Sequence, residues 1–291
     1  MESAVELQFL GCTCTVTGSK YLVTSGACRV LVDCGLFQGW KQLRLRNWAP
    51  PSFDAKRLDA VVLTHAHLDH SGYLPLLVKN GYKGPVYCTA ATANLCRILL
   101  PDAGRLQEEE AEHANRHALS KHAPAQPLYT EADAIAALEQ LLPQPFNQVF
   151  AVGGMKASLR PAGHILGAAG VLLENGSRSI YFSGDIGRFA DSLMKSPAPP
   201  PKADWLVIES TYGNRLHSEE DAVTRLGAII RRTARRKGVI VVPAFAVGRT
   251  QALLFAIFQL KKDGLIPPQL PVYLNSPMAT DVTALYRNHR A

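Results

Sequence analysis

Apolar residues gather in short runs along most of this chain, and in a strand–helix alternation towards its end. The early runs are rich in β-prone residues and are separated by turns that contain Gly or Ser, which favours antiparallel or mixed sheet. The later alternation is typical of a second α/β unit with a parallel sheet. The predicted strands are Val5–Phe9, Tyr21–Thr24, Cys28–Asp33, Ala60–Thr64, Pro85–Cys88, Val149–Val152, Lys156–Pro161, Ala169–Glu174, Arg178–Ser183, Trp205–Ile208, Val239–Pro243 and Pro271–Leu274.

Helices are predicted where apolar residues recur with helical spacing or where a capping signal precedes them. The polar and charged stretch Gln107–His122 is predicted to be an exposed helix or loop. Ser218–Asp221 is predicted to cap the first helix of the second unit. The predicted helices run from Ser71 to about Gly81, Ala90 to about Leu100, Thr130 to Leu142, after Asp221 to Lys237, about Thr250 to Lys262, and onwards from Met278.

The composition is that of a folded protein. Hydrophobic residues make up 47% of the 291 residues and charged residues 19%, which allows a sizeable core and argues against disorder. The net charge of +7 is compatible with a polyanionic substrate but does not establish one. The six cysteines lack zinc-finger spacing and are predicted to be reduced thiols. Because the sequence has no signal-peptide layout and no membrane span, we predict a cytoplasmic protein without a membrane partner.

The strongest chemical signal is the turn Thr64–His70, where three imidazoles and a carboxylate follow a predicted strand. Imidazole and carboxylate are ligands that suit zinc and related divalent ions. A strand that runs into a tight turn can aim alternate side chains at one point. His65 and His67 are therefore predicted to serve one metal, and Asp69 and His70 a second. Two metals a few Å apart form a hydrolytic site.

Four further turns carry the same ligand types at the ends of predicted strands. They hold Asp33, His164, Asp185 and Glu209. Each of these residues alone would usually be a turn or cap residue. Together with the histidine-rich turn, and in this order, they indicate one metal constellation.

The order of these motifs resembles the metallo-β-lactamase superfamily. The matching positions are Asp33, the turn His65–His70, His164 and Asp185. Later segments resemble one branch, the β-CASP nucleases. They are Ile208–Gly213, similar to that branch's acidic motif, and Pro243–Gln251, similar to the start of its inserted cap domain.

This resemblance implies the fold and the domain organisation. The fold class is α/β (α+β): the metallo-β-lactamase αββα four-layer sandwich, followed by the first part of a β-CASP α/β cap domain. We expect the metallo-β-lactamase domain over residues 1–212 and the partial β-CASP domain over residues 213–291.

The resemblance also implies a role for each site residue. The first metal would be held by His65, His67, His164 and Asp185. The second would be held by Asp69, His70 and Asp185, with Asp185 bridging the two. The implied catalytic residues are Asp69, Glu209 and Asp33, and Asp33 would orient ligand histidines through hydrogen bonds. Two Zn²⁺ ions are the expected cofactors, with Mn²⁺ as the alternative.

The function implied is a metal-dependent ribonuclease that hydrolyses phosphodiester bonds of single-stranded RNA through a metal-activated hydroxide. RNA is the expected partner, and a homodimer is a further expectation. Two alternatives stay open. A metallo-hydrolase of small substrates, similar to lactamases or thioesterases, shares the histidine-rich turn but does not explain Glu209. A non-catalytic scaffold of an RNA-processing complex fits less well, because every ligand position within this chain is filled.

Two histidines that the family places after its cap domain have no counterpart before Ala291. One would be the acid partner of Glu209, and the other the last ligand of the second metal. The chain is therefore expected to be the front portion of a longer protein. Alone, it is expected to bind at most one metal tightly and to be weakly active.

Basic residues next to aromatic ones form a second, weaker candidate site. Lys41, Arg44 and Arg46 lie between Trp40 and Trp48, and such a mixture can hold a single strand by charge and stacking. An exposed charge run is more often a solvated surface. The predicted nucleic-acid contacts are Lys41, Arg44, Arg46 and Arg249.

Overall fold

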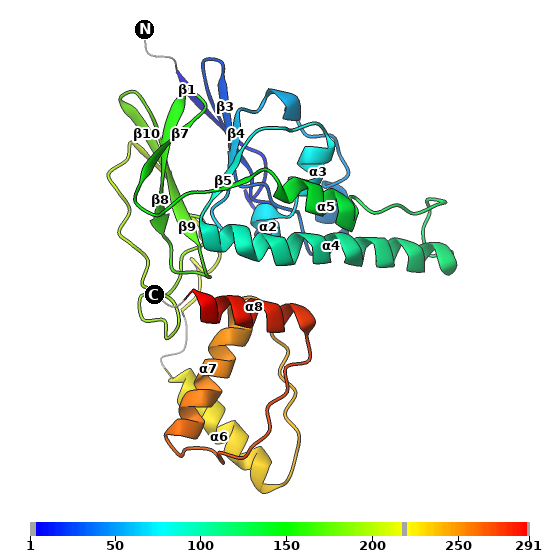
Figure 1. Ribbon diagram of the computed structural model, residues 1–291, viewed down its shortest axis with the longest axis vertical. Coiled ribbons are helices and arrows are strands. Elements are labelled where there is room, and N and C mark those ends of the chain that lie inside the picture. The colour runs from blue at the N-terminus through cyan, green and yellow to red at the C-terminus, as the bar shows by residue number, and fades with distance from the viewer. Residues whose placement is uncertain (1–3, 217–219, 290–291) are drawn as a thin grey trace. The chain divides into compact units, whose positions relative to one another are not determined.

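The computed structural model describes residues 4–216 and 220–289, which form two compact units (Figure 1). Unit 1 comprises the chain up to Phe189 together with Lys195–Glu209. Unit 2 comprises Ala190–Met194 and the chain from Ser210 onwards. The change of unit after Glu209 lies near the domain boundary predicted at residues 212 and 213. The assignment of the two units to family domains stays a prediction.

The first sheet of unit 1 has six strands in the order β1-β2-β3-β4-β5-β6. The first three strands pair antiparallel, and β3 to β6 pair parallel. Loops connect the first three strands, whereas helices lie between the later ones, and this accounts for the mixture because parallel neighbours need a crossover connection. The strands are β1 Val5–Phe9, β2 Tyr21–Ser25, β3 Cys28–Val32, β4 Ala60–Val62, β5 Val86–Cys88 and β6 Leu141–Pro143.

The second sheet has five strands in the order β11-β10-β9-β8-β7. All neighbours pair antiparallel except β10 and β11, which pair parallel. Its strands are β7 Val149–Val152, β8 Met155–Pro161, β9 Ala169–Asn175, β10 Arg178–Phe182 and β11 Trp205–Val207.

The main core lies between the two sheets. Alternate residues of each strand face inwards, as the period of two along a strand requires. The first sheet contributes Val30, Val32 and Val62, and the second contributes Leu159 and Phe182, all of them buried. This core holds the strand ends in place, and the site residues follow those ends.

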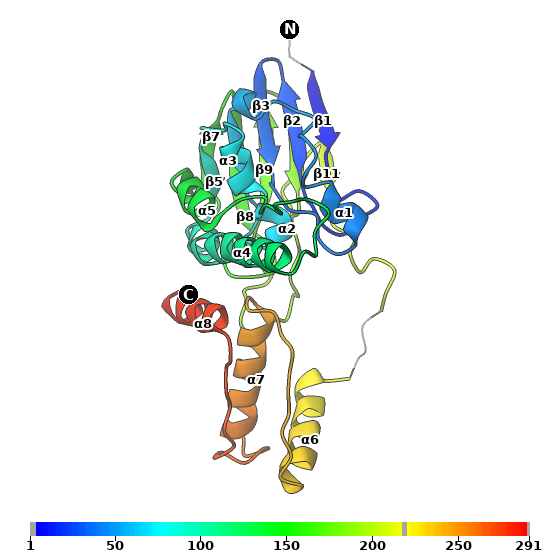
Figure 2. The same cartoon turned by 90° about the vertical axis from the view of Figure 1, so that its right-hand side faces the viewer.

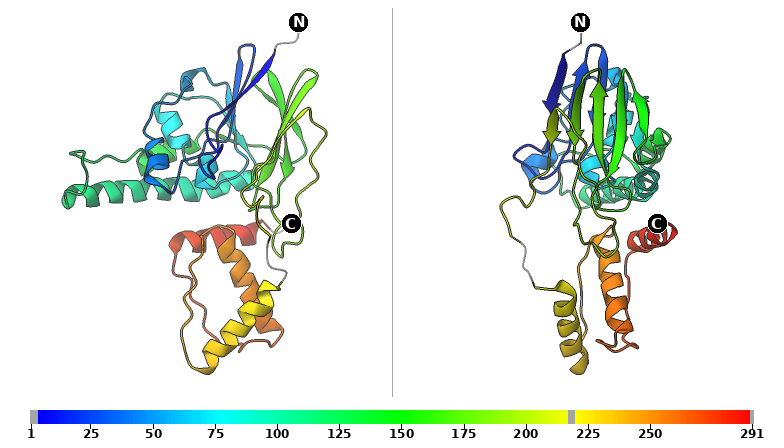
Figure 3. Two further views of the ribbon diagram at one scale, coloured as in Figure 1. Left: turned by 180° about the vertical axis from the view of Figure 1, so that it is seen from behind. Right: turned by 90° about the vertical axis from the view of Figure 1, so that its left-hand side faces the viewer.

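Helices of unit 1 cover the outer face of the first sheet (Figures 1 and 2). The strands of the second sheet face the viewer in the right-hand view of Figure 3 with no helix in front of them. The described part of unit 1 therefore shows the α/β class and both sheets, with one helical layer. The helices are α1 Lys41–Leu45, η1 Ala55–Arg57, α2 Leu68–Ser71, α3 Leu74–Lys79, α4 Ala90–Arg116 and α5 Glu131–Leu138.

Helix α4 is longer than predicted, because it continues through Pro101. A proline inside a helix removes one backbone hydrogen bond, yet the helix keeps buried residues on both sides of that position. Helix α5 is shorter than predicted and ends at Leu138, and Leu141–Pro143 forms strand β6 instead. The helix starts as predicted with Thr130, its N-cap, which forms a capping box with Asp133.

Over its described residues, unit 2 contains three helices: α6 Ala222–Arg235, α7 Arg249–Lys262 and α8 Pro277–Asn288. Asp221 caps α6 with its side chain, whereas Ser218 and Glu219 of the predicted cap lie outside the described residues. The two strands predicted here, Val239–Pro243 and Pro271–Leu274, are wrong: neither segment is a strand.

The predicted absence of a membrane span can be compared with the structure only where residues are described. Over residues 4–216 and 220–289, no helix has both the length and the apolar character needed to cross a bilayer.

Candidate metal centre

The predicted site residues of unit 1 follow the ends of strands from both sheets. Asp33 follows β3, Thr64 and the histidine-rich turn follow β4, and Asp185 follows β10. Because β3 and β4 are parallel neighbours, their carboxyl ends lie at one edge of the first sheet. The backbone NH of Ala169 donates a 2.8 Å hydrogen bond to the carbonyl of Thr64, which ties the two sheets together at this edge.

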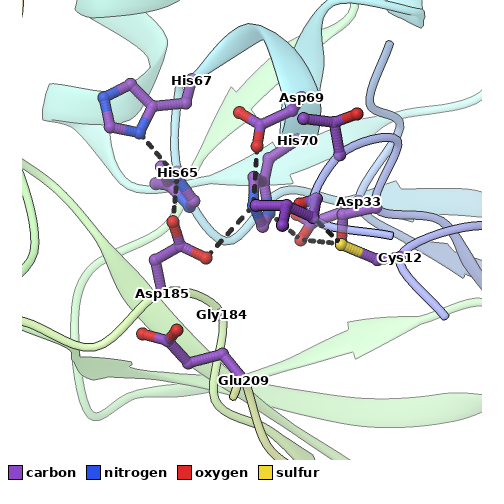
Figure 4. Close-up of polar contacts among 12 residues, drawn as sticks. Cys12, Asp33, His65, His67, Asp69, His70, Gly184, Asp185 and Glu209 are labelled. Carbon is purple, nitrogen blue, oxygen red and sulfur yellow. Dashed lines mark hydrogen bonds and ion pairs between the residues drawn. The ribbon is translucent and has the colours of Figure 1, made fainter. Parts of the chain in front are cut away.

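Four side chains bring their ligand atoms together in one cluster. Figure 4 shows three of them, His65, His67 and Asp185. His65, His67, His164 and Asp185 each offer one nitrogen or oxygen, and these four atoms lie within 4.8 Å of one another. His67 Nδ1 lies 3.1 Å from His65 Nε2 and 3.2 Å from His164 Nε2. The cluster therefore contains the donor set that suits a tetrahedral divalent ion.

Asp185 has one oxygen towards this cluster and the other towards His70. Its Oδ2 lies 3.4 Å from His164 Nε2 and 3.7 Å from His65 Nε2. Its Oδ1 lies 3.2 Å from His70 Nε2, and that nitrogen is 3.9 Å from Asp69 Oδ2. The structure thus brings together both predicted ligand groups, with Asp185 between them. The ligand roles themselves stay a prediction.

A buried hydrogen-bond network orients two of the imidazoles. Asp33 Oδ2 accepts from His70 Nδ1 at 2.7 Å and from the Thr64 hydroxyl at 2.9 Å. Because the Thr64 hydroxyl proton goes to Asp33, its oxygen can accept from His65 Nδ1, which lies 3.0 Å away. Both histidines then direct Nε2 towards Asp185, as ligand histidines do when their other nitrogen is held by a hydrogen bond.

The charges of the site suit neutral histidine ligands in the first cluster. Burial lowers the pKa of His65 well below its ordinary value, and the charges of His70, His67 and His164 act in the same direction. Burial and His164 lower the pKa of His67 to about 4. Burial also lowers the pKa of His164, against the opposing effect of Asp185. At neutral pH these three imidazoles are therefore unprotonated, which is the form that binds metals.

His70 behaves in the opposite way because it lies between carboxylates. Burial lowers its pKa, but Asp33 and Asp185 outweigh burial and raise that pKa well above its ordinary value. Burial raises the pKa of Asp185, but the hydrogen bond and charge of His70 lower it to about 2. His70 thus carries a proton on Nε2 beside Asp185, at the position where a divalent cation would replace it.

Glu209 supports the loop that carries Asp185. Its Oε1 accepts a 2.9 Å hydrogen bond from the backbone NH of Ile186, the residue after Asp185. Its own backbone NH donates to the Ser183 hydroxyl at 3.1 Å. Figure 4 shows the Glu209 side chain next to Asp185, on the side away from His67. Its predicted catalytic role is not tested by these contacts.

Two residues near the cluster were missed by sequence reasoning. Thr64 contacts both Asp33 and His65, as described above, and its place directly before His65 is a signal that could have been used. Cys12 was interpreted as an ordinary thiol, but it lies close to the site in Figure 4, and its Sγ donates to the Val16 carbonyl at 3.2 Å. Burial, with the charges of Asp69 and Asp185, raises its pKa, so the thiol is protonated at neutral pH.

The predicted nucleic-acid contacts lie apart in the sequence and belong to different units. Lys41, Arg44 and Arg46 are exposed residues in and after α1 of unit 1. Arg249 is an exposed residue at the start of α7 in unit 2. Their contacts with nucleic acid stay a prediction.

Asp33→Asn is expected to weaken zinc binding by roughly 10- to 100-fold, because the partner that orients a ligand histidine is usually worth that much. Asparagine carries no charge, and its NH2 group cannot accept the hydrogen bonds that the Asp33 carboxylate accepts from Thr64 and His70. Zinc affinity is measured by competition with a chromophoric chelator. Asp59→Asn is the matched control, since Asp59 also accepts a backbone NH, that of Arg29, outside this network. Equal zinc affinity of the Asp33→Asn variant and the unaltered chain would contradict the orienting role.

The sequence matches the model of the family described as "Metallo-beta-lactamase superfamily" over residues 16–222. That match includes Asp33, the histidine-rich turn, His164 and Asp185, the residues that the structure brings together. The chain belongs to the metallo-beta-lactamase superfamily. The predicted family is thereby confirmed, and so is the mixed α/β fold with two sheets.

Curated relatives narrow the resemblance. A ribonuclease of Thermus thermophilus is 38% identical over 93% of this chain and 58% of its own length. Transcription termination factor FttA of Methanosarcina mazei is 32% identical over 98% of this chain and 44% of its own. Cleavage and polyadenylation specificity factor 73 of Drosophila melanogaster is 31% identical over 90% of this chain and 36% of its own. These relatives confirm the resemblance to the RNA-processing β-CASP branch. The chain spans about half the length of the relatives it matches.

Proposed function

We propose that this chain carries the metal site of a ribonuclease that hydrolyses phosphodiester bonds of RNA. The observation that carries the proposal is the position of Asp185, whose two oxygens face the cluster of His65, His67 and His164 on one side and His70 on the other. One carboxylate shared by two imidazole groups fits a pair of divalent ions better than a single ion.

Zinc is the proposed metal because the ligands of the first cluster are mostly imidazoles, and Mn²⁺ is the alternative. Bound divalent ions would supply positive charge for the phosphate oxygens and would make a water molecule acidic enough to act as the nucleophile. His65, His67, His164 and Asp185 would hold the first ion. Asp69, His70 and Asp185 would hold the second more weakly, because this chain offers it three ligands instead of four.

The chain's own residues keep this site ordered and accessible. Asp33 and Thr64 fix the rings of His70 and His65 before any ion binds. His65 is fully buried, whereas the side chains of Asp185 and His164 are 26% and 28% exposed. Solvent and a phosphate group can thus reach the site from the side of these last two residues. Glu209, which holds the backbone after Asp185, is proposed as a further catalytic residue.

RNA as the substrate is supported by the printed names of the relatives, among them a ribonuclease aligned over 93% of this chain. Charge alone does not distinguish RNA from DNA, since both present the same phosphate backbone. A hydrolase of small substrates would need the same metal cluster, so it is treated as an outcome of the test.

Chelation is expected to abolish cleavage of a labelled single-stranded RNA by this protein, and added Zn²⁺ or Mn²⁺ is expected to restore it. The reason is that the nucleophile and the charge on phosphate both depend on the ions. Cleavage is followed on a denaturing gel, with a DNA strand of the same sequence and a β-lactam in parallel.

The paired variants for this assay are His67→Ala and His113→Ala. His67 lies in the cluster, whereas His113 is an exposed residue of α4. Only His67→Ala is expected to remove activity and zinc. RNA cleavage that survives both the chelator and His67→Ala would refute the proposed function, and turnover of the β-lactam without RNA cleavage would favour the small-substrate alternative.

A further inference from the structure

The segment between β3 and η1 exposes aromatic surface that the fold does not use. Trp40 and Trp48 flank the short helix α1, with 79% and 55% of their surfaces exposed. Single exposed apolar residues are common on proteins, but two exposed tryptophans so close in sequence present a large area for stacking.

The charge of this segment is of one sign. Lys41, Arg44 and Arg46 are all exposed, and no Asp or Glu occurs from Cys34 to Phe53. Cations placed between exposed aromatic rings match a single nucleic-acid strand, whose phosphates are negative and whose unpaired bases have free faces. An acidic peptide would satisfy the cations alone and would leave the rings without partners.

The segment is held in one conformation by a buried side chain. Asn47 is 4% exposed, and its Oδ1 accepts from the backbone NH of Phe37 at 2.9 Å. Its Nδ2 donates to the carbonyl of Phe37 at 2.8 Å, which closes the loop around α1. The guanidinium of Arg46 lies over the Phe37 ring at 4.0 Å from its centre. Because the loop is ordered before binding, a ligand does not have to supply the cost of ordering it.

The same segment begins beside the histidine-rich turn of the metal centre. The backbone NH of Cys34 donates to the His70 carbonyl at 2.7 Å, and that of Leu36 donates to the Leu68 carbonyl at 2.8 Å. These bonds join the start of the loop to α2, which carries Asp69 and His70. Figure 2 shows α1 and α2 at the same end of the first sheet. The start of this segment therefore lies directly beside the turn that carries Asp69 and His70.

We propose that Trp40, Lys41, Arg44 and Trp48 form a single-strand surface that binds RNA beside the cleaved bond, with bases stacked on the tryptophans and phosphates on the cations. This inference rests on the proposed function, because it takes RNA as the substrate. It assigns the surface a role in binding and no role in bond cleavage.

Removing one tryptophan is expected to weaken RNA binding by about ten-fold, because the variant loses the stacking of one base. Trp40→Ala and Trp48→Ala are compared with Trp40→Phe, which keeps an aromatic face and most of the affinity. Affinity is measured by fluorescence anisotropy of a fluorescein-labelled oligouridylate, with chelator present so that no cleavage occurs. The logarithm of the RNA affinity falls linearly with the logarithm of the salt concentration. Replacing Lys41 and Arg44 by Ala is expected to reduce the magnitude of this slope by about 0.7 for each cation removed.

The chain offers a matched control in its third tryptophan. Trp205 begins β11, and the Arg178 guanidinium lies 5.6 Å from the centre of its ring. This pair also combines an exposed aromatic ring with a cation, but it lies at the strand ends opposite to those that lead to Asp185 and Glu209. Trp205→Ala is expected to leave RNA affinity unchanged.

The outcomes separate this inference from the proposed function. Binding that falls with Trp40→Ala and Trp48→Ala but not with Trp205→Ala supports the surface, even if the chain proves unable to cleave RNA. RNA binding that is unchanged in both variants overturns the surface, even if cleavage is normal. Equal affinity for a duplex RNA of the same length would also overturn it, because paired bases cannot stack on the tryptophans.

Discussion

Asp185→Asn is expected to lower RNA cleavage by at least about 10³-fold, because it affects both proposed metal positions at once. Ions that stabilise charge in the reaction are worth several kcal/mol, and each 1.36 kcal/mol corresponds to about ten-fold in rate. Asparagine keeps the size of the side chain but replaces one acceptor oxygen by an NH2 group and removes the negative charge. The measurements are cleavage of labelled RNA and the zinc content of the purified protein by mass spectrometry.

Asp204→Asn is the control for this variant. Asp204 also lies in unit 1 and accepts hydrogen bonds from Ser179, but it directly precedes β11, at the strand end opposite to the one that leads to Glu209. We expect the control to keep its zinc and activity. An Asp185→Asn variant that retains the zinc content and the cleavage rate of the unaltered chain would show that Asp185 does not bridge two ions.

The chemistry of the site could be predicted from the sequence because most of its ligand residues lie in one short segment. From His65 to His70 the chain leaves a strand and enters a single helical turn, so the directions of these side chains follow from backbone geometry. Asp185 was more distant, yet it follows a clearly patterned strand, β10. The sequence also predicted that distant turns place their ligand residues in one site, because each turn follows the end of a strand in one of two packed sheets.

Other features could not be predicted because they depend on contacts between distant residues. Continuation of α4 through Pro101 depends on packing: Gly104, one turn later, lies against the backbone of Thr130 before α5. Asp33, which accepts a hydrogen bond from the Thr64 hydroxyl, has a left-handed backbone, and its φ of 58° is unusual for a residue other than glycine. Neither the packing at Gly104 nor the backbone conformation of Asp33 can be read from a local sequence pattern.

The error in unit 2 has a similar origin. Val239–Pro243 and Pro271–Leu274 have the composition of strands, but a strand exists only when its backbone groups pair with a neighbour. Over the described residues no such pairing occurs in unit 2, and Val239, Val241 and Tyr273 are more than four-fifths exposed. Apolar composition thus indicated which segments favour extended structure, but not whether a partner strand lies beside them.

Gly35→Ala is expected to lower the free energy of unfolding by about 3 kcal/mol and to reduce zinc binding with it. A Cβ on Gly35 would overlap the backbone carbonyl of Asp69, and backbone atoms there cannot rotate away as a flexible side chain can. The loop after β3 must then separate from the histidine-rich turn. That movement breaks the hydrogen bonds from Cys34 to His70 and from Leu36 to Leu68 that hold the second ligand group in place.

Chemical denaturation and zinc titration of the same samples measure both expected effects of Gly35→Ala. Gly154→Ala is the matched control in unit 1, since a Cβ there meets its nearest neighbour, Cys28, at an ordinary 3.7 Å. The control is expected to unfold at the same denaturant concentration as the unaltered chain. If Gly35→Ala also unfolded there and bound zinc normally, the close approach of the two loops would not be what positions Asp69 and His70. If Gly35→Ala weakened zinc binding but unfolded at the same denaturant concentration as the unaltered chain, the close approach of the two loops would act mainly on the metal centre.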